Sequence, residues 1–352
     1  MSSTRTALSS AVSEVPDEVV GVTAGLTRDG SRATRRRWLP VVCNWAGFVL
    51  GIVLCYGLFR QVDFALLRDA LAGVEPWWVG VALLSVAATV WVRAMRWRVL
   101  LAVEQPPQSP VLLSRWVAVG QVLNSVVPAR AGEVARAYLG GAAGPAAKCF
   151  ALGTVGAEKL VDLVVWSGML LLALAWFPMP LWVVRGAGVL LAVLLAALVG
   201  LAVGLWLVSR LFRNDLQRLL GEKPGLRGAV TWAQAVWNGV WVLFRPGVFG
   251  RVLAWSAALS MLYLVNNLAV FYALGICGSV RDALVVLVIL QAGIVPPSTP
   301  AKVGVFEYLC VLSIGLLGFG QMTGMAYGVL LHMVVLLPPL VLVLLPIRRV
   351  AP

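Results

Sequence analysis

The sequence predicts an all-α integral membrane protein, and three observations support this fold class. Hydrophobic residues make up 61% of the 352 positions and charged residues only 12%, against about 25% in an ordinary soluble domain. The mean hydropathy is +0.91. The apolar residues also gather in runs of about 20, the length that a helix needs to cross the hydrocarbon core. A chain of this composition needs lipid as its solvent.

Apolar runs of two kinds follow one another along the chain. Six are long enough for full spans: 39–59, 78–96, 149–176, 182–208, 252–274 and 324–346. Two further regions, 111–148 and 281–320, each contain two short helix-like pieces separated by a charged break with proline. We expect these two regions to be re-entrant hairpins, which are stable only where protein or water surrounds them. Two complete spans in each, giving eight or more in all, remain the alternative.

The basic residues predict the orientation, because segments rich in Lys and Arg stay on the cytoplasmic side. The polar segment 1–37 is expected to be a disordered cytoplasmic tail, and 349–352 a short cytoplasmic tail. Between them, 38–348 forms the membrane domain. Within it, 210–250 combines basic residues with tryptophans and is expected to be an amphipathic segment on the cytoplasmic interface.

The composition also excludes several classes of partner and cofactor. A net charge of +13 is compatible with nucleic-acid binding, but the arginines cluster at the ends of apolar runs, as the positive-inside rule requires. We therefore expect no nucleic-acid partner. The five cysteines have no CxxC spacing and there is one histidine, so neither a metal site nor another cofactor is expected.

The two predicted hairpins share a tip motif, Pro-Ala-(Arg or Lys)-x-Gly followed by Glu. Its residues are Asn124, Pro128, Arg130, Gly132 and Glu133 in the first hairpin and Pro300, Lys302, Gly304 and Glu307 in the second. The predicted orientation places the two hairpins between spans of opposite direction, so the two span–hairpin–span units are inverted. Inverted repeats with broken helices are typical of transporters.

The tip residues suit anion binding. Proline ends the incoming helix and glycine permits the turn, while the outgoing helix begins with free N–H groups. We therefore expect Arg130 and Lys302 to bind a phosphate. Glu133 and Glu307 fall in the first turn, where the helix dipole stabilises a carboxylate. Alternatively, each base–glutamate pair only closes its own hairpin.

Three charged residues, Glu158, Lys159 and Asp162, lie inside an apolar span. Each charge at the centre of a span costs about 2.5–3.5 kcal/mol, so unpaired charges are not expected there. Lys159 and Asp162 can pair at i,i+3. Glu158 needs a cation from elsewhere, for which Arg130 or Lys302 are candidates. Both a structural ion network and a headgroup or proton site remain open.

Other polar residues in the spans have less specific interpretations. Arg93 and Arg96 lie near the cytoplasmic end of their span, where snorkelling to the interface or contact with a headgroup is expected. His332 is expected to be a hydrogen-bonded packing residue. Asn266 and Asn267 either cross-link helices or line a cavity.

Four motifs occur in the order of a known family. They are Arg93-x-x-Arg96-Trp97-x-x-Leu100-Leu101, Asn124-x-x-x-Pro128-x-Arg130-x-Gly132-Glu133-x-x-Arg136-x-Tyr138-Leu139, Glu158-Lys159-x-x-Asp162 and Pro300-x-x-x-Gly304-x-x-Glu307. Over about residues 40–347 they resemble the transmembrane, flippase-like region of bacterial lysylphosphatidylglycerol synthases and its stand-alone relatives. The resemblance implies a lipid translocase fold in the bacterial cytoplasmic membrane, with phospholipids or polyprenyl-linked lipids as substrates.

The resemblance has limits. The synthases carry a further cytoplasmic domain that transfers lysine from its tRNA; we expect that activity to be absent from this chain. The second tip of the family usually reads Pro-Gly-Gly-(Leu/Val/Ile)-Gly, whereas Ala301 and Lys302 take the first two glycine positions here. The family often has Arg in place of His332. These two departures are expected to affect which headgroup is accepted.

The leading hypothesis is a flippase-like transporter, not an enzyme, that moves an anionic phospholipid or polyprenyl-linked headgroup. The residues expected to contact headgroups are Arg130, Lys302, Arg136, Arg93 and Arg96. The residues expected to balance charge are Glu133, Glu158, Lys159, Asp162 and Glu307. Membrane lipids are the expected partners; a lipid-modifying partner enzyme and self-association stay open. One alternative is a membrane enzyme or accessory subunit with Glu158 or Asp162 as acid/base, and another is a scaffold without transport.

Overall fold

The computed structural model describes most of the predicted membrane domain. The described residues are 68, 71–126, 131–141, 144–176, 224–294 and 300–345, with isolated positions between 181 and 204. The predicted span 39–59 and both predicted tails lie outside them. The span predicted at 182–208 is described only at isolated positions.

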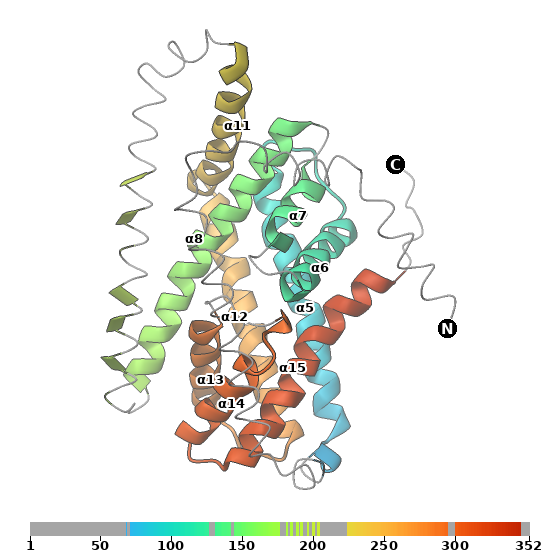
Figure 1. Ribbon diagram of the computed structural model, residues 1–352, viewed down its shortest axis with the longest axis vertical. Coiled ribbons are helices and arrows are strands. Elements are labelled where there is room, and N and C mark those ends of the chain that lie inside the picture. Colours follow the sequence, from blue (N-terminus) through green and yellow to red (C-terminus); the bar gives the residue numbers. More distant parts are fainter. Residues whose placement is uncertain are drawn as a thin grey trace, which may run out of the picture. The chain divides into compact units, whose positions relative to one another are not determined.

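Four long helices correspond to predicted spans. They are α5 (Pro76–Leu101), α8 (Pro145–Trp176), α12 (Val248–Ala273) and α15 (Gln321–Leu344). Each is long and apolar enough to cross a membrane, and Figure 1 shows them as the longest ribbons in the bundle. The described residues contain helices and no strand. The predicted all-α membrane fold is therefore confirmed, and these four helices match four of the six predicted full spans.

Shorter helices occupy the two predicted hairpin regions. The first holds α6 (Pro110–Val126) and α7 (Ala131–Gly140), and the second holds α13 (Val280–Gly293) and α14 (Val305–Leu316). Each is shorter than the roughly 20 residues of a full span. A short 3-10 helix, η3 (Pro300–Lys302), precedes α14. The order long, short, short, long thus occurs twice among the described helices.

One further helix lies within the predicted interfacial segment 210–250. α11 (Pro224–Trp241) is followed by the 3-10 helix η2 (Val242–Phe244) and packs along α8. The two helices approach closely at Gly153 and Gly239: a Cβ on Gly153 would lie 2.1 Å from the carbonyl oxygen of Val236. This segment therefore contributes a packed helix to the bundle, with Trp232 and Trp241 exposed on its surface.

Local sequence explains where several helices begin. Proline occupies the first position of α5, α6, α8 and α11, where its missing N–H costs no helical hydrogen bond. α13 begins with a capping box: the backbone N–H of Asp282 donates to Ser279 Oγ over 3.3 Å, and the backbone N–H of Ser279 donates to the Asp282 carboxylate over 2.8 Å.

α5 and α12 form the central antiparallel pair. Ser85 lies 3.4 Å from Asn266, and Arg96 donates to Ser256 over 3.0 Å, so residue numbers rise along one helix as they fall along the other. One apolar cluster contains the C-terminal half of α5 with α6, α8 and the start of α12. A second contains the N-terminal half of α5 with the end of α12, α13, α14 and α15. Helix α15 packs against α6, and α8 packs against α13.

Candidate functional site

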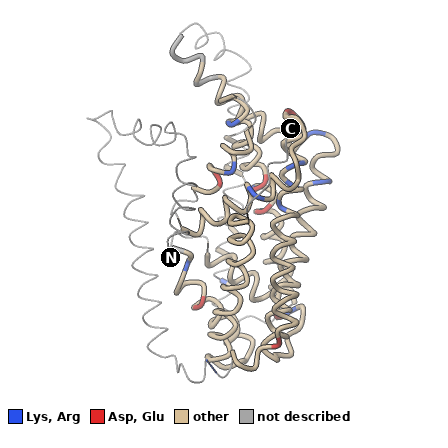
Figure 2. The backbone as a smooth tube through the Cα atoms, turned by 90° about the vertical axis from the view of Figure 1, so that its right-hand side faces the viewer, with Lys and Arg blue, Asp and Glu red and all other residues tan. Residues whose placement is uncertain are grey.

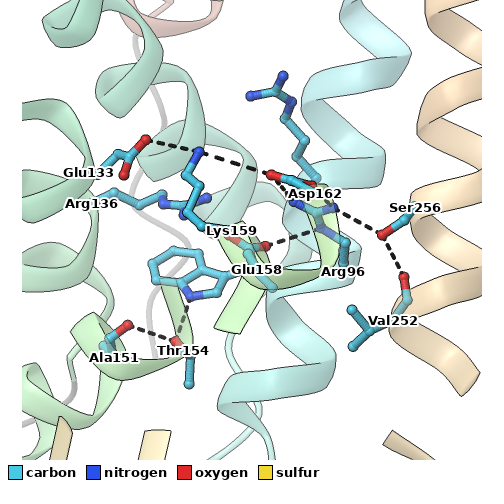
Figure 3. Close-up of polar contacts among 12 residues, drawn as sticks. Arg96, Glu133, Arg136, Ala151, Thr154, Glu158, Lys159, Asp162, Val252 and Ser256 are labelled. Carbon is cyan, nitrogen blue, oxygen red and sulfur yellow. Dashed lines mark hydrogen bonds and ion pairs between the residues drawn. The ribbon is translucent and has the colours of Figure 1, made fainter. Parts of the chain in front are cut away.

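Six charged side chains form an unbroken chain of opposite charges between α5, α7 and α8. In order of contact they are Arg136, Glu158, Arg96, Asp162, Lys159 and Glu133. The signs alternate along the chain, so three cations face three carboxylates. Figure 2 shows that most charged positions of the described part lie toward one end of the helices, and Figure 3 shows the contacts of this site.

Glu158 lies at the buried end of the chain and is only 1% exposed. One carboxylate oxygen accepts from Arg136 Nη2 over 2.6 Å, and the other accepts from Arg96 Nε over 3.4 Å. Both arginines are buried as well. A buried carboxylate without these partners would be strongly destabilising, so the two arginines and Glu158 depend on one another.

Arg96 connects three helices. Its Nη1 donates to Asp162 Oδ1 over 2.5 Å and to Ser256 Oγ over 3.0 Å (Figure 3). The side chain is 4% exposed, so the expectation that Arg96 snorkels to the interface is wrong. A hydrogen-bonded network of carboxylates inside the bundle offers the guanidinium a better environment than the rim.

The other end of the chain is open to the surroundings. Lys159 Nζ lies 2.9 Å from Glu133 Oε1 and 4.0 Å from Asp162 Oδ2. The exposed side-chain fractions are 42% for Lys159, 27% for Asp162 and 23% for Glu133. The predicted Lys159–Asp162 contact is present, but the shorter contact joins Lys159 to α7. The chain of charges therefore runs from a buried end to an accessible one.

An indole supports the buried end. The guanidinium of Arg136 lies over the ring of Trp97 at 4.8 Å from the centroid, a favourable cation–π arrangement. Trp97 Nε1 donates to Thr154 Oγ1 over 3.0 Å, which holds the ring in place (Figure 3). Sequence reasoning assigned no role to Thr154, and a lone threonine in an apolar span carries no pattern that identifies one.

The second hairpin tip is organised around Glu307 and His332. Glu307 accepts a hydrogen bond from the backbone N–H of Gly304 over 2.7 Å, and its other oxygen lies 2.6 Å from His332 Nδ1. His332 Nε2 lies 2.9 Å from the carbonyl oxygen of Ala301. Since a carbonyl only accepts, Nε2 carries a hydrogen. His332 is hydrogen-bonded, as expected, and it also fixes the tip.

The backbone of this tip is left-handed at consecutive residues. The φ angles are 53° at Ala301, 61° at Lys302 and 87° at Gly304. Only glycine adopts this region without steric cost. The family resemblance puts glycine at the positions of Ala301 and Lys302, and the left-handed turn explains that preference.

The first tip is described in part. Pro128 and Arg130 lie outside the described residues, so the structure neither supports nor opposes their predicted roles. The side chain of Asn124 accepts from the backbone N–H of Gly132 over 2.9 Å, which joins the end of α6 to the start of α7. Beside this bond, a Cβ on Gly132 would lie 1.9 Å from the carbonyl oxygen of Gly120.

Several predicted pairings are changed by the tertiary structure. Glu158 was expected to meet Arg130 or Lys302; its cations are Arg136 and Arg96. Arg136, expected to recruit headgroups at the surface, is buried on Glu158. Glu133 and Glu307 do not simply close their own hairpins, because each pairs with the long helix that follows, α8 or α15.

The remaining polar residues cross-link helices. Arg93 donates to the hydroxyl of Tyr263 through Nε over 3.0 Å and through Nη2. Asn266 contacts Ser85 on α5, and Asn267 Oδ1 accepts from the hydroxyl of Tyr327 on α15 over 2.7 Å. Of the two expectations for the asparagine pair, helix cross-linking is the one observed. No group of three His, Cys, Asp or Glu residues within the described ranges could hold a metal ion.

Comparison with known families identifies the chain. Its sequence matches the family described as the lysylphosphatidylglycerol synthase TM region over residues 44–342. The chain belongs to this family. A comparison with curated proteins gave no match. All six residues of the alternating charge chain and both hairpin tips lie within the matched range.

Proposed function

We propose that this member of the lysylphosphatidylglycerol synthase TM family is a flippase-like transporter. It moves the headgroup of an anionic phospholipid or polyprenyl-linked lipid across the bacterial cytoplasmic membrane. The observation that carries the proposal is the alternating chain from Glu158 to Glu133, which extends from a buried to an accessible position between apolar helices. Charged residues within apolar spans are costly, and they commonly mark substrate or ion pathways.

The alternation of charges suits exchange with an anionic headgroup. A phosphate that reaches the accessible end meets Lys159, whose present partners are the carboxylates of Glu133 and Asp162. These pairs are partly exposed, so each contributes less than a fully buried pair would. A phosphate can therefore replace a carboxylate at little cost, while the buried Glu158 keeps its arginines and preserves the bundle.

The arrangement of the helices supports an inverted repeat. One unit runs from α5 to α8 and the other from α12 to α15. Their first helices, α5 and α12, pair with each other. The last helix of each unit packs on the first short helix of the other, α8 on α13 and α15 on α6. A two-fold axis relating the units would produce this reciprocal pattern. The tip helix η3 also packs against α6. Transporters of this type place the substrate between the repeats.

Reconstitution in vesicles tests the proposal. Vesicles of phosphatidylcholine with a trace of headgroup-labelled phosphatidylglycerol, or of a labelled polyprenyl phosphate, are exposed to a membrane-impermeant quencher. We expect the protein to move label between the leaflets at a rate above that of empty vesicles. Failure with both lipids would contradict the proposal. Recovery of chemically altered lipid by mass spectrometry would favour the enzyme hypothesis instead.

Exchanging the two charges of the Glu133–Lys159 ion pair distinguishes an effect on transport from an effect on stability. The double variant Glu133→Lys with Lys159→Glu keeps one opposite-charge pair between α7 and α8 but reverses its polarity. We expect it to fold with a small loss of stability, because the new carboxylate at position 159 lies near Asp162. It should transport at least about tenfold more slowly, because a phosphate arriving at position 159 meets a carboxylate. The matched control is Glu104→Arg with Arg245→Glu, which reverses an exposed pair that is not part of the charge chain. Equal transport by both double variants would contradict the assigned path.

A further inference from the structure

Among the described residues, Arg93 lies next to the alternating chain but outside it. The alternating chain contains three cations and three carboxylates, and Arg93 lies beside it on α5, one turn from Arg96. Among the described residues, Arg93 has no carboxylate within ion-pair distance; its hydrogen-bond partner is the neutral hydroxyl of Tyr263. A guanidinium about 12 Å before the end of α5 is costly in lipid without an anion.

The guanidinium of Arg93 is held in place and still offers donors. Nε and Nη2 both donate to the Tyr263 hydroxyl, and the guanidinium carbon lies 5.7 Å from the Tyr263 ring centroid. Nη1 makes no hydrogen bond to the described residues. No buried side-chain nitrogen or oxygen in the described part lacks a partner. Nη1 is therefore not fully enclosed by the described residues, and the Arg93 side chain is half-buried.

Aromatic rings lie beside this free donor. Tyr263 on α12 stacks on Trp166 of α8, with ring centroids 5.8 Å apart and an interplanar angle of 24°. Trp166 is one helical turn after Asp162, which lies at the accessible end of the charge chain. A cation and an aromatic wall together suit a molecule with an anionic group and a carbon skeleton, because the rings cover carbon while the guanidinium binds oxygen.

The other candidate cations are already occupied. Arg96 donates through Nε, Nη1 and Nη2, Arg136 is buried between Glu158 and the Trp97 ring, and Lys159 pairs with two carboxylates. Releasing Arg96 or Arg136 for a ligand would uncover the buried carboxylate of Glu158, and Lys159 must first give up an ion pair. Arg93 alone among these four can take an anion without breaking an ion pair.

We propose that Arg93 Nη1, beside the Tyr263 and Trp166 rings, is the primary contact for the phosphate of a membrane lipid. This inference rests on the proposed function for the lipid nature of the ligand, and it names the residue that selects for phosphate. Bound there, the phosphate neutralises the charge of Arg93 and lies next to Asp162 and Lys159, where the path of exchange begins.

Native mass spectrometry of the detergent-solubilised full chain tests this contact. The probes are phosphatidylglycerol, diacylglycerol with the same acyl chains, and inorganic phosphate. We expect the native protein to prefer phosphatidylglycerol to diacylglycerol, and Arg93→Gln to lose that preference by about tenfold or more, since a charged hydrogen bond is lost. The matched control Arg98→Gln, on the same helix, should keep the preference. Inorganic phosphate should compete with phosphatidylglycerol for the Arg93 site only at millimolar concentration.

A milder pair of variants guards against misfolding. Arg93→Lys keeps the charge but replaces the planar guanidinium, whose separate nitrogens reach Tyr263 and a phosphate, by a single ammonium nitrogen. Tyr263→Phe removes the hydroxyl that holds the guanidinium. Each variant should weaken the preference about threefold. Unchanged preference in Arg93→Gln, or equal loss of diacylglycerol and phosphatidylglycerol, would overturn the assignment. So would binding of inorganic phosphate without phosphatidylglycerol.

The vesicle assay keeps the two proposals apart. Arg93-dependent binding in a protein that moves no lipid would leave this site standing and reject the transporter. Transport that is unaffected by Arg93→Gln would leave the transporter standing and reject the Arg93 site.

Discussion

The two helical units hold their hairpins in the same way but differ greatly in charge. In each, a glutamate from the second short helix pairs with a base on the long helix that follows: Glu133 with Lys159, and Glu307 with His332. The unit from α5 to α8 adds Arg96, Arg136, Glu158 and Asp162 to this pair. One such pair is therefore enough to hold a hairpin against the long helix that follows. The additional charges of the first unit are the ones to which we assign the proposed headgroup path.

The largest expected effect concerns the buried centre of the charged unit. Glu158→Ala leaves Arg96 and Arg136 without their shared carboxylate, and removing one partner of a buried ion pair costs about 3–5 kcal/mol. Unfolding in detergent, followed by circular dichroism during titration with a denaturing detergent, measures the loss. The exposed Glu104→Ala serves as the control and should cost less than about 1 kcal/mol. Similar values for both would remove the distinction between buried and accessible charges.

The next effect concerns how closely the first hairpin is packed. Gly132→Ala places a Cβ against the carbonyl oxygen of Gly120, and such overpacking costs about 3 kcal/mol where backbone must move. Gly168→Ala, in α8, has nothing within 4 Å of the new Cβ and should be neutral or slightly stabilising. The same unfolding titration compares them. A neutral Gly132→Ala would show that α6 and α7 can separate freely.

The Glu307–His332 pair of the second unit should contribute less to the free energy of unfolding than the buried charges around Glu158 in the first unit. Among the described residues, His332→Ala leaves the backbone N–H of Gly304 as the hydrogen-bond donor to Glu307 and removes the donor to the Ala301 carbonyl. An unsatisfied buried group costs about 2 kcal/mol. His332→Arg, the residue that the family often has here, should retain most of the stability. If His332→Ala costs as much as Glu158→Ala, the two units do not differ as described.

The smallest effect is stabilising and tests the left-handed tip. Ala301→Gly relieves a left-handed conformation that costs a non-glycine residue about 1–2 kcal/mol, partly offset by the greater freedom of glycine in the unfolded chain. A net gain of about 0.5–1 kcal/mol is expected. Ala254→Gly, exposed within α12, should instead lose about 1 kcal/mol. Destabilisation by both would mean that position 301 does not need the left-handed turn.

Much of the site was visible in the sequence as residue types, while the pairings were not. Glu158, Lys159 and Asp162 stand out because charges are rare in apolar runs, and Glu307 stands out in the repeated tip motif. The cations for Glu158 were assigned to the wrong residues, because the sequence showed the repeated tips but not how deeply α5 enters the bundle. Arg96 looked like an interfacial residue from its place near the end of a span.

The sequence by itself determined the membrane class, four of the spans in the described part, the short broken helices and the family. Those properties follow from the length and composition of continuous segments, which are local. Only the tertiary structure decided that Arg96 and Arg136 share Glu158 and that His332 holds the second tip. It also decided that Arg93 has no carboxylate within ion-pair distance among the described residues. These depend on the rotation and depth of helices packed side by side, and residues distant in the chain set both.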